Sequence, residues 1–324
     1  MRAKIILFST GGTIAMRYSP ESGGATPALS GSELIASLPA CRFPVEVREF
    51  SNIPSPHMTP KLMLDLARQV EQVLSAKTTA GVVVTHGTDT LEETAYFLDL
   101  YVRADKALCL TGAMRDADEL CPDGPKNLLC ALKVAASPEA AKKGCLVVMN
   151  EEIHAAREVT KVHSSSLKTF ASPFWGPLGH ADVDRLIFRR APLGRQTLHP
   201  ENIEEDVHLI KCAAGCDDFL LHSLTEKKAK GIVVEGMGRG NVPPLVFNGI
   251  KEALAAGIPV VLASRCLSGR TLDHYAYAGG AKKLHDAGVI LGGEISGPKA
   301  RIKLMLALGL TRDPDRLAEY FDKP

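Results

Sequence analysis

Short apolar runs alternate with longer amphipathic stretches along most of the chain, and this alternation restricts its fold more than any other feature. Apolar runs of this length are typical of buried strands, and the stretches between them of helices, so their order predicts βαβ units around a parallel sheet. In the first half we expect strands at 5–8, 45–50, 82–85, 107–110 and 145–149. The pattern therefore predicts an α/β fold.

The alternation is interrupted between Phe188 and about Cys216, where arginine, proline and glycine residues break it. A length of 324 residues is enough for two domains, each with its own core. We predict a large N-terminal domain with a mainly parallel sheet, a connector and a smaller C-terminal α/β domain. Their predicted ranges are 1–188, 189–212 and 213–324, with later strands at 231–234, 258–263 and 289–291 and final helices at 298–309 and 313–322.

Several helix starts carry capping signals. Ser30 with Glu33 three residues later has the pattern of a capping box, and Thr59 precedes Pro60 at a first helical position. Thr90 is expected to cap a third helix, whose acidic first turn suits the helix dipole. The corresponding helices are predicted at about 31–38, 60–76 and 91–101.

Charge and cysteine content exclude several classes of protein. Lys plus Arg total 38 and Asp plus Glu total 37, so no strong field attracts nucleic acid or an anionic membrane. The cysteines lack the paired spacing of a zinc site, and several fall in apolar runs, so we interpret them as reduced core residues of a cytoplasmic protein. They lie at positions 41, 109, 121, 130, 145, 212, 216 and 266.

The hydropathy pattern gives no sign of export or of a membrane. The apolar stretch near the N-terminus is too short for a signal peptide, and no apolar run approaches the ~18 residues of a membrane helix. We therefore expect a cytoplasmic protein that acts on a small molecule without a metal or cofactor.

The first predicted strand ends in the sequence STGGTIA, residues 9–15. In an open parallel sheet, ligands bind beyond the carboxyl ends of the strands, where this loop lies. Its two glycines let the backbone approach a ligand and offer N–H groups for an oxyanion or a phosphate. The lysine of a P-loop and the G-x-G-x-x-G spacing are both missing. Taken alone, Gly-Gly-Thr is most often an ordinary turn.

A second strand, 82–85, runs into the sequence HGTDTLEETA, residues 86–95. It places a hydroxyl beside a carboxylate at a strand end and a helix start. We expect both loops to share one rim of the sheet.

Together, STGGTIA and THGTDTLEETA resemble the two signature motifs of the bacterial L-asparaginase/glutaminase family. The resemblance covers essentially the whole chain and implies hydrolysis of L-asparagine to L-aspartate and ammonia. Three alternatives stay open: an amide hydrolase for glutamine or D-isomers, an amino-acid-binding or sensing homologue, and an amidotransferase subunit. The neutral charge, and the absence of an extra domain before STGGTIA, argue against the last. Further matching segments are 111–115, 123–125 with Asn127, 159–161, 176–179 and 238–241.

The resemblance implies a role for particular residues. Thr13 is the nucleophile that forms an acyl-enzyme, and a threonine hydroxyl needs a proton acceptor to react. Thr88, Asp89 and Lys161 are the supporting group: a desolvated Lys161 would act as base through Thr88, while Asp89 orients it and holds the substrate's α-ammonium. The resemblance also implies that Gly12 and Gly87 bind the substrate.

Two further residues are implied in substrate binding. Ser55 matches the serine that binds the α-carboxylate, although a serine between two prolines also fits a simple turn. The backbone carbonyl of Ala113 matches an acceptor for the substrate amide.

The chain departs from the family pattern around the substrate. Residues 16–31 resemble the lid that closes over the nucleophile, but the lid tyrosine is replaced by Ala25. A hydroxyl would have to come from Tyr18, Ser19 or Ser22. Pro56 replaces a glutamine that contacts the substrate amine, and it has no polar side-chain group.

The second half carries a further departure and the interface signal. The glutamate that a neighbouring subunit lends to the site has no clear counterpart, and Asp273 and Tyr275 are the candidates. Asn241 matches a residue at the family's dimer interface, which predicts a homodimer or homotetramer. A turn asparagine beside Gly240 is the alternative.

Overall fold

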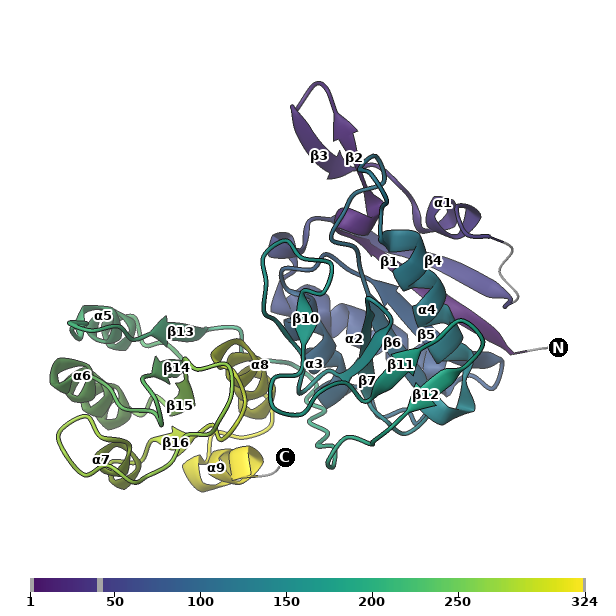
Figure 1. The fold of residues 1–324 in the computed structure, drawn as a ribbon. Coiled ribbons are helices and arrows are strands. Elements are labelled where there is room, and N and C mark those ends of the chain that lie inside the picture. The colour runs from purple at the N-terminus through teal and green to yellow at the C-terminus, as the bar shows by residue number, and fades with distance from the viewer. Residues whose placement is uncertain (1–2, 40–42, 323–324) are drawn as a thin grey trace. The chain divides into compact units, whose positions relative to one another are not determined.

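The computed structural model describes residues 3–39 and 43–322, and it divides into two compact units, 1–197 and 198–324. Each unit is built of helices around its own sheet, with eight strands in the first and four in the second (Figure 1). The predicted fold class, a large and mainly parallel α/β unit followed by a smaller one, is confirmed.

The sheet of the first unit has the order β12-β11-β8-β7-β6-β5-β1-β4. The five strands from β4 to β7 pair in parallel and correspond to the five predicted strands. Three short antiparallel strands extend the sheet beyond β7, and the prediction missed them. The bounds are β1 Lys4–Gly11, β4 Val45–Ile53, β5 Thr79–Thr85, β6 Ala107–Thr111, β7 Cys145–Met149, β8 Glu152–Ala155, β11 Gly179–Ala181 and β12 Leu186–Phe188.

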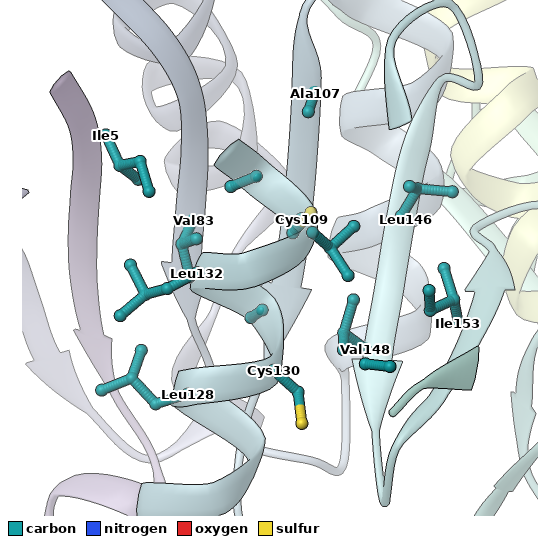
Figure 2. Close-up of a cluster of buried hydrophobic side chains, with 14 of the residues drawn as sticks. Ile5, Val83, Ala107, Cys109, Leu128, Cys130, Leu132, Leu146, Val148 and Ile153 are labelled. Atoms are coloured by element: carbon teal, nitrogen blue, oxygen red, sulfur yellow. The ribbon is translucent and has the colours of Figure 1, made fainter. Parts of the chain in front are cut away.

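Helices cover this sheet and complete its core. Figure 2 shows Leu128 and Leu132 of α4 against the strands that carry Val83 and Cys109. Strands buried on both faces need continuous apolar runs, which is why the sequence pattern identified them. The helices are α1 Gly31–Ala36, α2 Pro60–Ser75, α3 Leu91–Tyr101 and α4 Gly124–Ala136, with short 3-10 turns η1 Thr13–Ala15, η2 Ser55–His57 and η3 Pro138–Ala140.

Two of the three predicted helix caps are present. Ser30 and Glu33 form the reciprocal capping box of α1, and Leu62 N donates to Thr59 Oγ1 at 3.2 Å at the start of α2. The prediction for Thr90 is wrong, because its hydroxyl makes no capping bond and donates instead to Ser55 O at 2.8 Å. The loop before α3 is therefore tied to the loop after β4.

The second unit has a parallel sheet of order β13-β14-β15-β16. Its first strand lies within the segment predicted as connector, and the prediction is wrong there, because His208 and Lys211 obscure the apolar pattern of an edge strand. The strands are β13 Val207–Lys211, β14 Gly231–Gly236, β15 Val260–Ser264 and β16 Ile290–Leu291. The helices are α5 Phe219–Glu226, α6 Pro244–Ala255, α7 Ala281–Asp286, α8 Gly297–Leu308 and α9 Pro314–Asp322.

Two small hairpins lie outside the main sheets. One pairs β2 Met16–Ser19 with β3 Gly24–Pro27, directly after the STGGTIA loop. The other pairs β9 Thr160–Lys161 with β10 Phe170–Ala171. The sequence pattern predicted neither hairpin, because strands of two to four residues are too short to show a period.

The cysteines are only partly core residues. Those at 109, 130, 145 and 212 are buried, whereas Cys121 and Cys266 are exposed, so the prediction is wrong for these two. Cys216 is half-buried, and Cys41 lies outside the described residues. Among the helices described, none has both the length and the apolar character needed to cross a membrane.

Candidate active site

Four loops at the carboxyl ends of neighbouring strands pack against one another, backbone to backbone. A Cβ atom built on Gly12, after β1, would lie 2.2 Å from Gly87 N, after β5. One built on Gly87 would lie 2.7 Å from Ser55 Cβ, after β4, and one on Gly112, after β6, would lie 2.4 Å from His86 O. Real Cβ atoms do not approach so closely, so these glycines allow the loops to meet. The predicted shared rim is confirmed.

Thr13 follows this contact directly and is the first residue of η1. The turn is closed by a bond from Met16 N to Thr13 O, and Ala15 N donates to Gly12 O at 2.9 Å. Gly11 and Gly12 both have positive φ, which suits glycine. The expectation that Gly12 offers its N–H to a ligand is wrong, because this N–H donates to Ile53 O at 3.0 Å.

Lys161 joins the second loop through its side chain. Its Nζ donates to Thr88 Oγ1 at 2.9 Å and to Asp89 Oδ1 at 2.7 Å. Thr88 is buried and the Lys161 side chain is 15% exposed, whereas the Asp89 side chain is 62% exposed. The amine is thus held between a buried hydroxyl and a carboxylate open to solvent. Lys161 is therefore not a solvated surface lysine.

Glu92 fixes the strand that carries this lysine. Its Oε1 accepts from Thr160 Oγ1 at 3.0 Å and from Lys161 N at 3.2 Å. The sequence interpretation assigned Glu92 only a favourable place in the helix dipole, and missed this role because the partners lie 68 and 69 residues away along the chain. A glutamate in the first turn of α3 therefore connects the second loop to β9.

Ser55 is buried and connects two loops. Its Oγ accepts from Asp89 N at 3.2 Å, and its carbonyl accepts the hydroxyl of Thr90. It begins η2 between Pro54 and Pro56. The structure brings Ser55 to Asp89, as the sequence predicted for a shared site, and its binding of a carboxylate stays a prediction.

Ala113 is fully buried in the loop after β6, and two polar side chains fix the backbone around it. Met114 N and Arg115 N donate to Asp123 Oδ1 at 3.0 and 2.9 Å. Asn127 Nδ2 donates to Gly112 O at 3.0 Å. Asp123 and Asn127 were part of the matching sequence segments, and the structure gives them this supporting role.

His86 clamps the second loop to α3. The imidazole is fully buried, with Nδ1 2.7 Å from Gly87 O and Nε2 3.0 Å from Thr94 Oγ1. Burial lowers the pKa of His86 to about 4, although the bond to Gly87 acts in the opposite direction. A neutral ring that donates from Nδ1 and accepts at Nε2 satisfies both partners. Sequence reasoning passed over this histidine, although it lies inside the second motif.

Two residues of the second unit that were predicted to lie at a subunit interface contact other residues of the same unit. Asn241 Oδ1 accepts from Ala281 N at 3.3 Å, and Asp273 Oδ2 lies 3.2 Å from His285 Nδ1. Their predicted roles at a subunit interface stay predictions. In the described part of the chain, no three His, Cys, Asp or Glu side chains are grouped so as to hold a metal ion.

The chain belongs to the asparaginase family, a family of hydrolases that act on linear amides. Residues 4–193 match the model described as Asparaginase, N-terminal, and residues 206–321 the Glutaminase/Asparaginase C-terminal domain. The resemblance inferred from the sequence is confirmed.

Individual relatives cover almost the whole chain. A probable L-asparaginase of Deinococcus radiodurans is 39% identical in an alignment of 326 positions that covers 98% of this chain and 97% of that protein. The L-asparaginase of Bacillus licheniformis is 37% identical over 310 residues, covering 95% and 96%. The crystal structure of a probable cytoplasmic L-asparaginase from Campylobacter jejuni superposes with a TM-score of 0.89 at 32% identity, covering both chains completely.

Proposed function

We propose that this protein hydrolyses the side-chain amide of L-asparagine to give L-aspartate and ammonia, with Thr13 as the nucleophile. Relatives that carry the name L-asparaginase and align over almost the full length of the chain support the reaction. The observation that carries the mechanism is the contact of Lys161 Nζ with Thr88 Oγ1 at 2.9 Å, beside the rim where Gly12 meets Gly87.

The proposed proton path runs from Thr13 to Thr88 and Lys161. Thr13 passes its proton to the Thr88 hydroxyl as its oxygen attacks the amide carbon, and Thr88 passes its own proton to Lys161 Nζ, which acts in this step as a free amine. The amine then gives a proton to the amide nitrogen, so that the C–N bond breaks, ammonia leaves and an ester to Thr13 remains. Water attacks the ester carbon and its proton takes the same path to Lys161, which returns it to the Thr13 oxygen as L-aspartate is released. Asp89 Oδ1, 2.7 Å from the amine, holds Lys161 in place and presents an exposed carboxylate to the α-ammonium of the substrate.

The same proposal assigns the remaining binding groups. Ser55 binds the α-carboxylate and the Ala113 carbonyl accepts from the substrate amide, because both are held in the loops that meet at this rim. Gly12 and Gly87 bring the two motif loops close enough for one small substrate to contact both.

Ammonia release by Thr13→Ala tests the nucleophile. The wild-type protein should turn over asparagine, and the variant should retain no more than about 10⁻³ of kcat, because no other hydroxyl takes the place of a missing nucleophile. Thr79→Ala is the control, since Thr79 lies at the amino end of β5, away from the rim. A Thr13→Ala variant that keeps a few per cent of the rate would refute the assignment.

Glutamine is the second candidate substrate, because the C-terminal model includes glutaminases and one methylene is worth only ~1–3 kcal/mol in a pocket. The values of kcat/KM for asparagine, glutamine and their D-isomers decide the preference. A higher value for glutamine would overturn the substrate assignment.

An amino-acid-binding protein without activity would bind asparagine in calorimetry yet release no ammonia from any of the four amides.

We further propose that the active protein is a cytoplasmic homo-oligomer built from dimers, with Asn241 at the dimer interface. The family membership of the second unit and the cytoplasmic relative support this arrangement. Light scattering after gel filtration should give a dimer or tetramer mass, and Asn241→Arg should lower it. A monomer at assay concentration with full activity would contradict the proposal.

A further inference from the structure

Lys161 lies on a short hairpin. Its ladder places Lys161 opposite Phe170 and Thr160 opposite Ala171, Val162 N donates to Thr169 O at 2.8 Å beyond this ladder, and the two strands form a separate sheet. An isolated pair of strands is at best marginally stable in water. Contacts with the rest of the first unit must therefore hold this hairpin, and with it the amine, in place.

The two strands are anchored on different sides. Glu92 of α3 holds β9, as described above. On the other strand, Ser172 follows β10 directly, and its Oγ lies 2.9 Å from His154 Nδ1. The exposed fractions are 4% for Ser172 and 1% for His154, so no solvent competes for this bond.

His154 belongs to β8, a strand of the main sheet with partners on both sides. It pairs with β7 and β11, and a two-residue turn at Asn150 and Glu151, both with positive φ, joins it tightly to β7. A side chain on β8 is therefore fixed relative to the strands whose loops form the site.

Glu152 occupies the same face of β8, because side chains two residues apart on a strand point the same way. Its Oε2 lies 3.2 Å from His154 Nε2, and its Oε1 lies 3.1 Å from Lys168 Nζ in the loop between β9 and β10. Ile153, between them, points to the opposite face and joins the hydrophobic core. This face of β8 thus contacts the hairpin at two places, Lys168 and Ser172.

The hydrogen positions follow from the partners of the imidazole. Burial lowers the pKa of His154 to about 4, against the opposing effect of the Glu152 carboxylate, so the ring is neutral at neutral pH. A carboxylate beside Nε2 favours the proton on that nitrogen. Nδ1 is then an acceptor, and the hydroxyl of Ser172 donates to it.

We propose that His154 is a positioning residue for Lys161: through its bond to Ser172 it keeps the β9–β10 hairpin where the amine meets Thr88. The inference rests on the proposed function, in which Lys161 is the base. His154 touches neither substrate nor reacting atoms, and it acts only through the hairpin.

Four variants separate this role from simple stabilisation. His154→Leu and Ser172→Ala each remove the bond, and His154→Asn keeps an acceptor near the position of Nδ1. Ile153→Val is the matched control, because it removes a methyl group from the same strand on its other face and should lower stability without loosening the hairpin. Each variant is assayed for kcat, KM and the free energy of unfolding in urea.

We expect His154→Leu and Ser172→Ala to lower kcat by about tenfold with KM changed less than about twofold, because the binding loops are untouched. The double variant should be no slower than either single one, since both remove one interaction. His154→Asn should recover most of the rate, and Ile153→Val should leave kcat unchanged. Equal effects on kcat for Ile153→Val and His154→Leu would overturn the proposal, and so would an unchanged kcat in His154→Leu.

Hydrogen exchange gives a readout that does not depend on activity. Amides of residues 160–162 and 169–171 should exchange faster in His154→Leu and keep the wild-type rate in Ile153→Val. Unchanged exchange in His154→Leu would contradict the positioning role. If instead Lys161→Met stays fully active while the exchange result is as expected, the proposed proton path fails and the anchoring of the hairpin stands.

Discussion

Tyr18 lies directly opposite Ala25 in the antiparallel β2–β3 hairpin. Residues opposite each other have Cβ atoms about 4.5–5.5 Å apart and share one face of the hairpin. Ala25 occupies the place where the family resemblance implies a lid tyrosine. The phenol missing from β3 is therefore present one strand away, on the face that Ala25 presents. The other two candidates have partners within the hairpin turn: Ser22 directs its hydroxyl to Ser19 O and Gly24 O, and Ser19 Oγ accepts from Ser22 N at 3.4 Å.

Tyr18→Phe should therefore lower kcat by about ten- to a hundredfold and leave the free energy of unfolding nearly unchanged. The side chain is 58% exposed, so loss of its hydroxyl costs little stability. On our hypothesis that the β2–β3 hairpin closes over Thr13, the Tyr18 hydroxyl would reach the nucleophile and take part in proton transfer. Tyr277→Phe, another exposed tyrosine, is the control. A Tyr18→Phe variant with wild-type kcat would mean that the lid works without this phenol.

Lys161→Met should reduce kcat by about 10²–10⁴, the usual worth of a positioned proton acceptor. Lys161→Arg should not restore the rate, because guanidinium does not give up its proton at neutral pH. Lys77→Met removes an exposed lysine at the amino end of the sheet and should be silent. The assay is single-turnover ammonia release, and substantial activity in Lys161→Arg would exclude a base role for the amine.

Gly12→Ala should destabilise the first unit through backbone strain and through a steric clash. Gly12 has φ 80° and ψ 180°, a region almost restricted to glycine, where strain costs roughly 1–3 kcal/mol, and a Cβ 2.2 Å from Gly87 N adds overpacking of about 1–3 kcal/mol. Gly23→Ala also places an alanine at positive φ, +68°, but its Cβ meets nothing within 4 Å, so it gives the cost of a positive φ without the clash. Urea unfolding of the two variants gives the difference, and equal losses would show that the loops separate easily.

Stability should fall as the pH decreases from about 6.5 to about 4, partly because of His86 and His154. Burial lowers the pKa of each to about 4 in the folded protein, whereas an unfolded histidine takes up its proton near 6.5. The unfolded state therefore binds more protons across this window, and each unit of pKa difference is worth about 1.4 kcal/mol. Above pH 6.5 these two histidines do not make the free energy of unfolding depend on pH.

Urea unfolding at several pH values between 7 and 4 measures this slope. His86→Gln removes one titrating group and should give a flatter curve than wild type, even if the variant is less stable at pH 7. An identical slope in His86→Gln and wild type would show that His86 does not remain neutral in the folded protein.

The sequence predicted those parts of the molecule in which local pattern and position agree. The runs at 82–85 and 107–110 are buried on both faces, so their apolar character identified β5 and β6 correctly. The loops after β1 and β5 were placed at one rim by the geometry of parallel sheets. The starts of α1 and α2 followed from the caps Ser30 and Thr59.

What the sequence could not show are contacts between distant segments. Thr90 has the composition of a cap, but Ser55 O competes successfully for its hydroxyl. Glu92 has the position of a dipole-stabilising residue, yet it binds β9. His154 and Ser172 lie 18 residues apart on strands too short to have a recognisable period. In each case a tertiary partner decides the role of a polar residue whose local signal points elsewhere.

The bond between Lys161 and Thr88 joins residues 73 positions apart, and this separation sets an order of events during synthesis. The ribosome releases Thr13, Ser55 and Thr88 before Lys161, and at about 5–20 residues per second the lysine follows Thr88 by roughly 4–15 s. The nascent chain therefore contains most of the proposed substrate-binding loops before Lys161 has been synthesised. On our proposed mechanism, the protein becomes active only when the hairpin that carries Lys161 docks beside strands that are already synthesised.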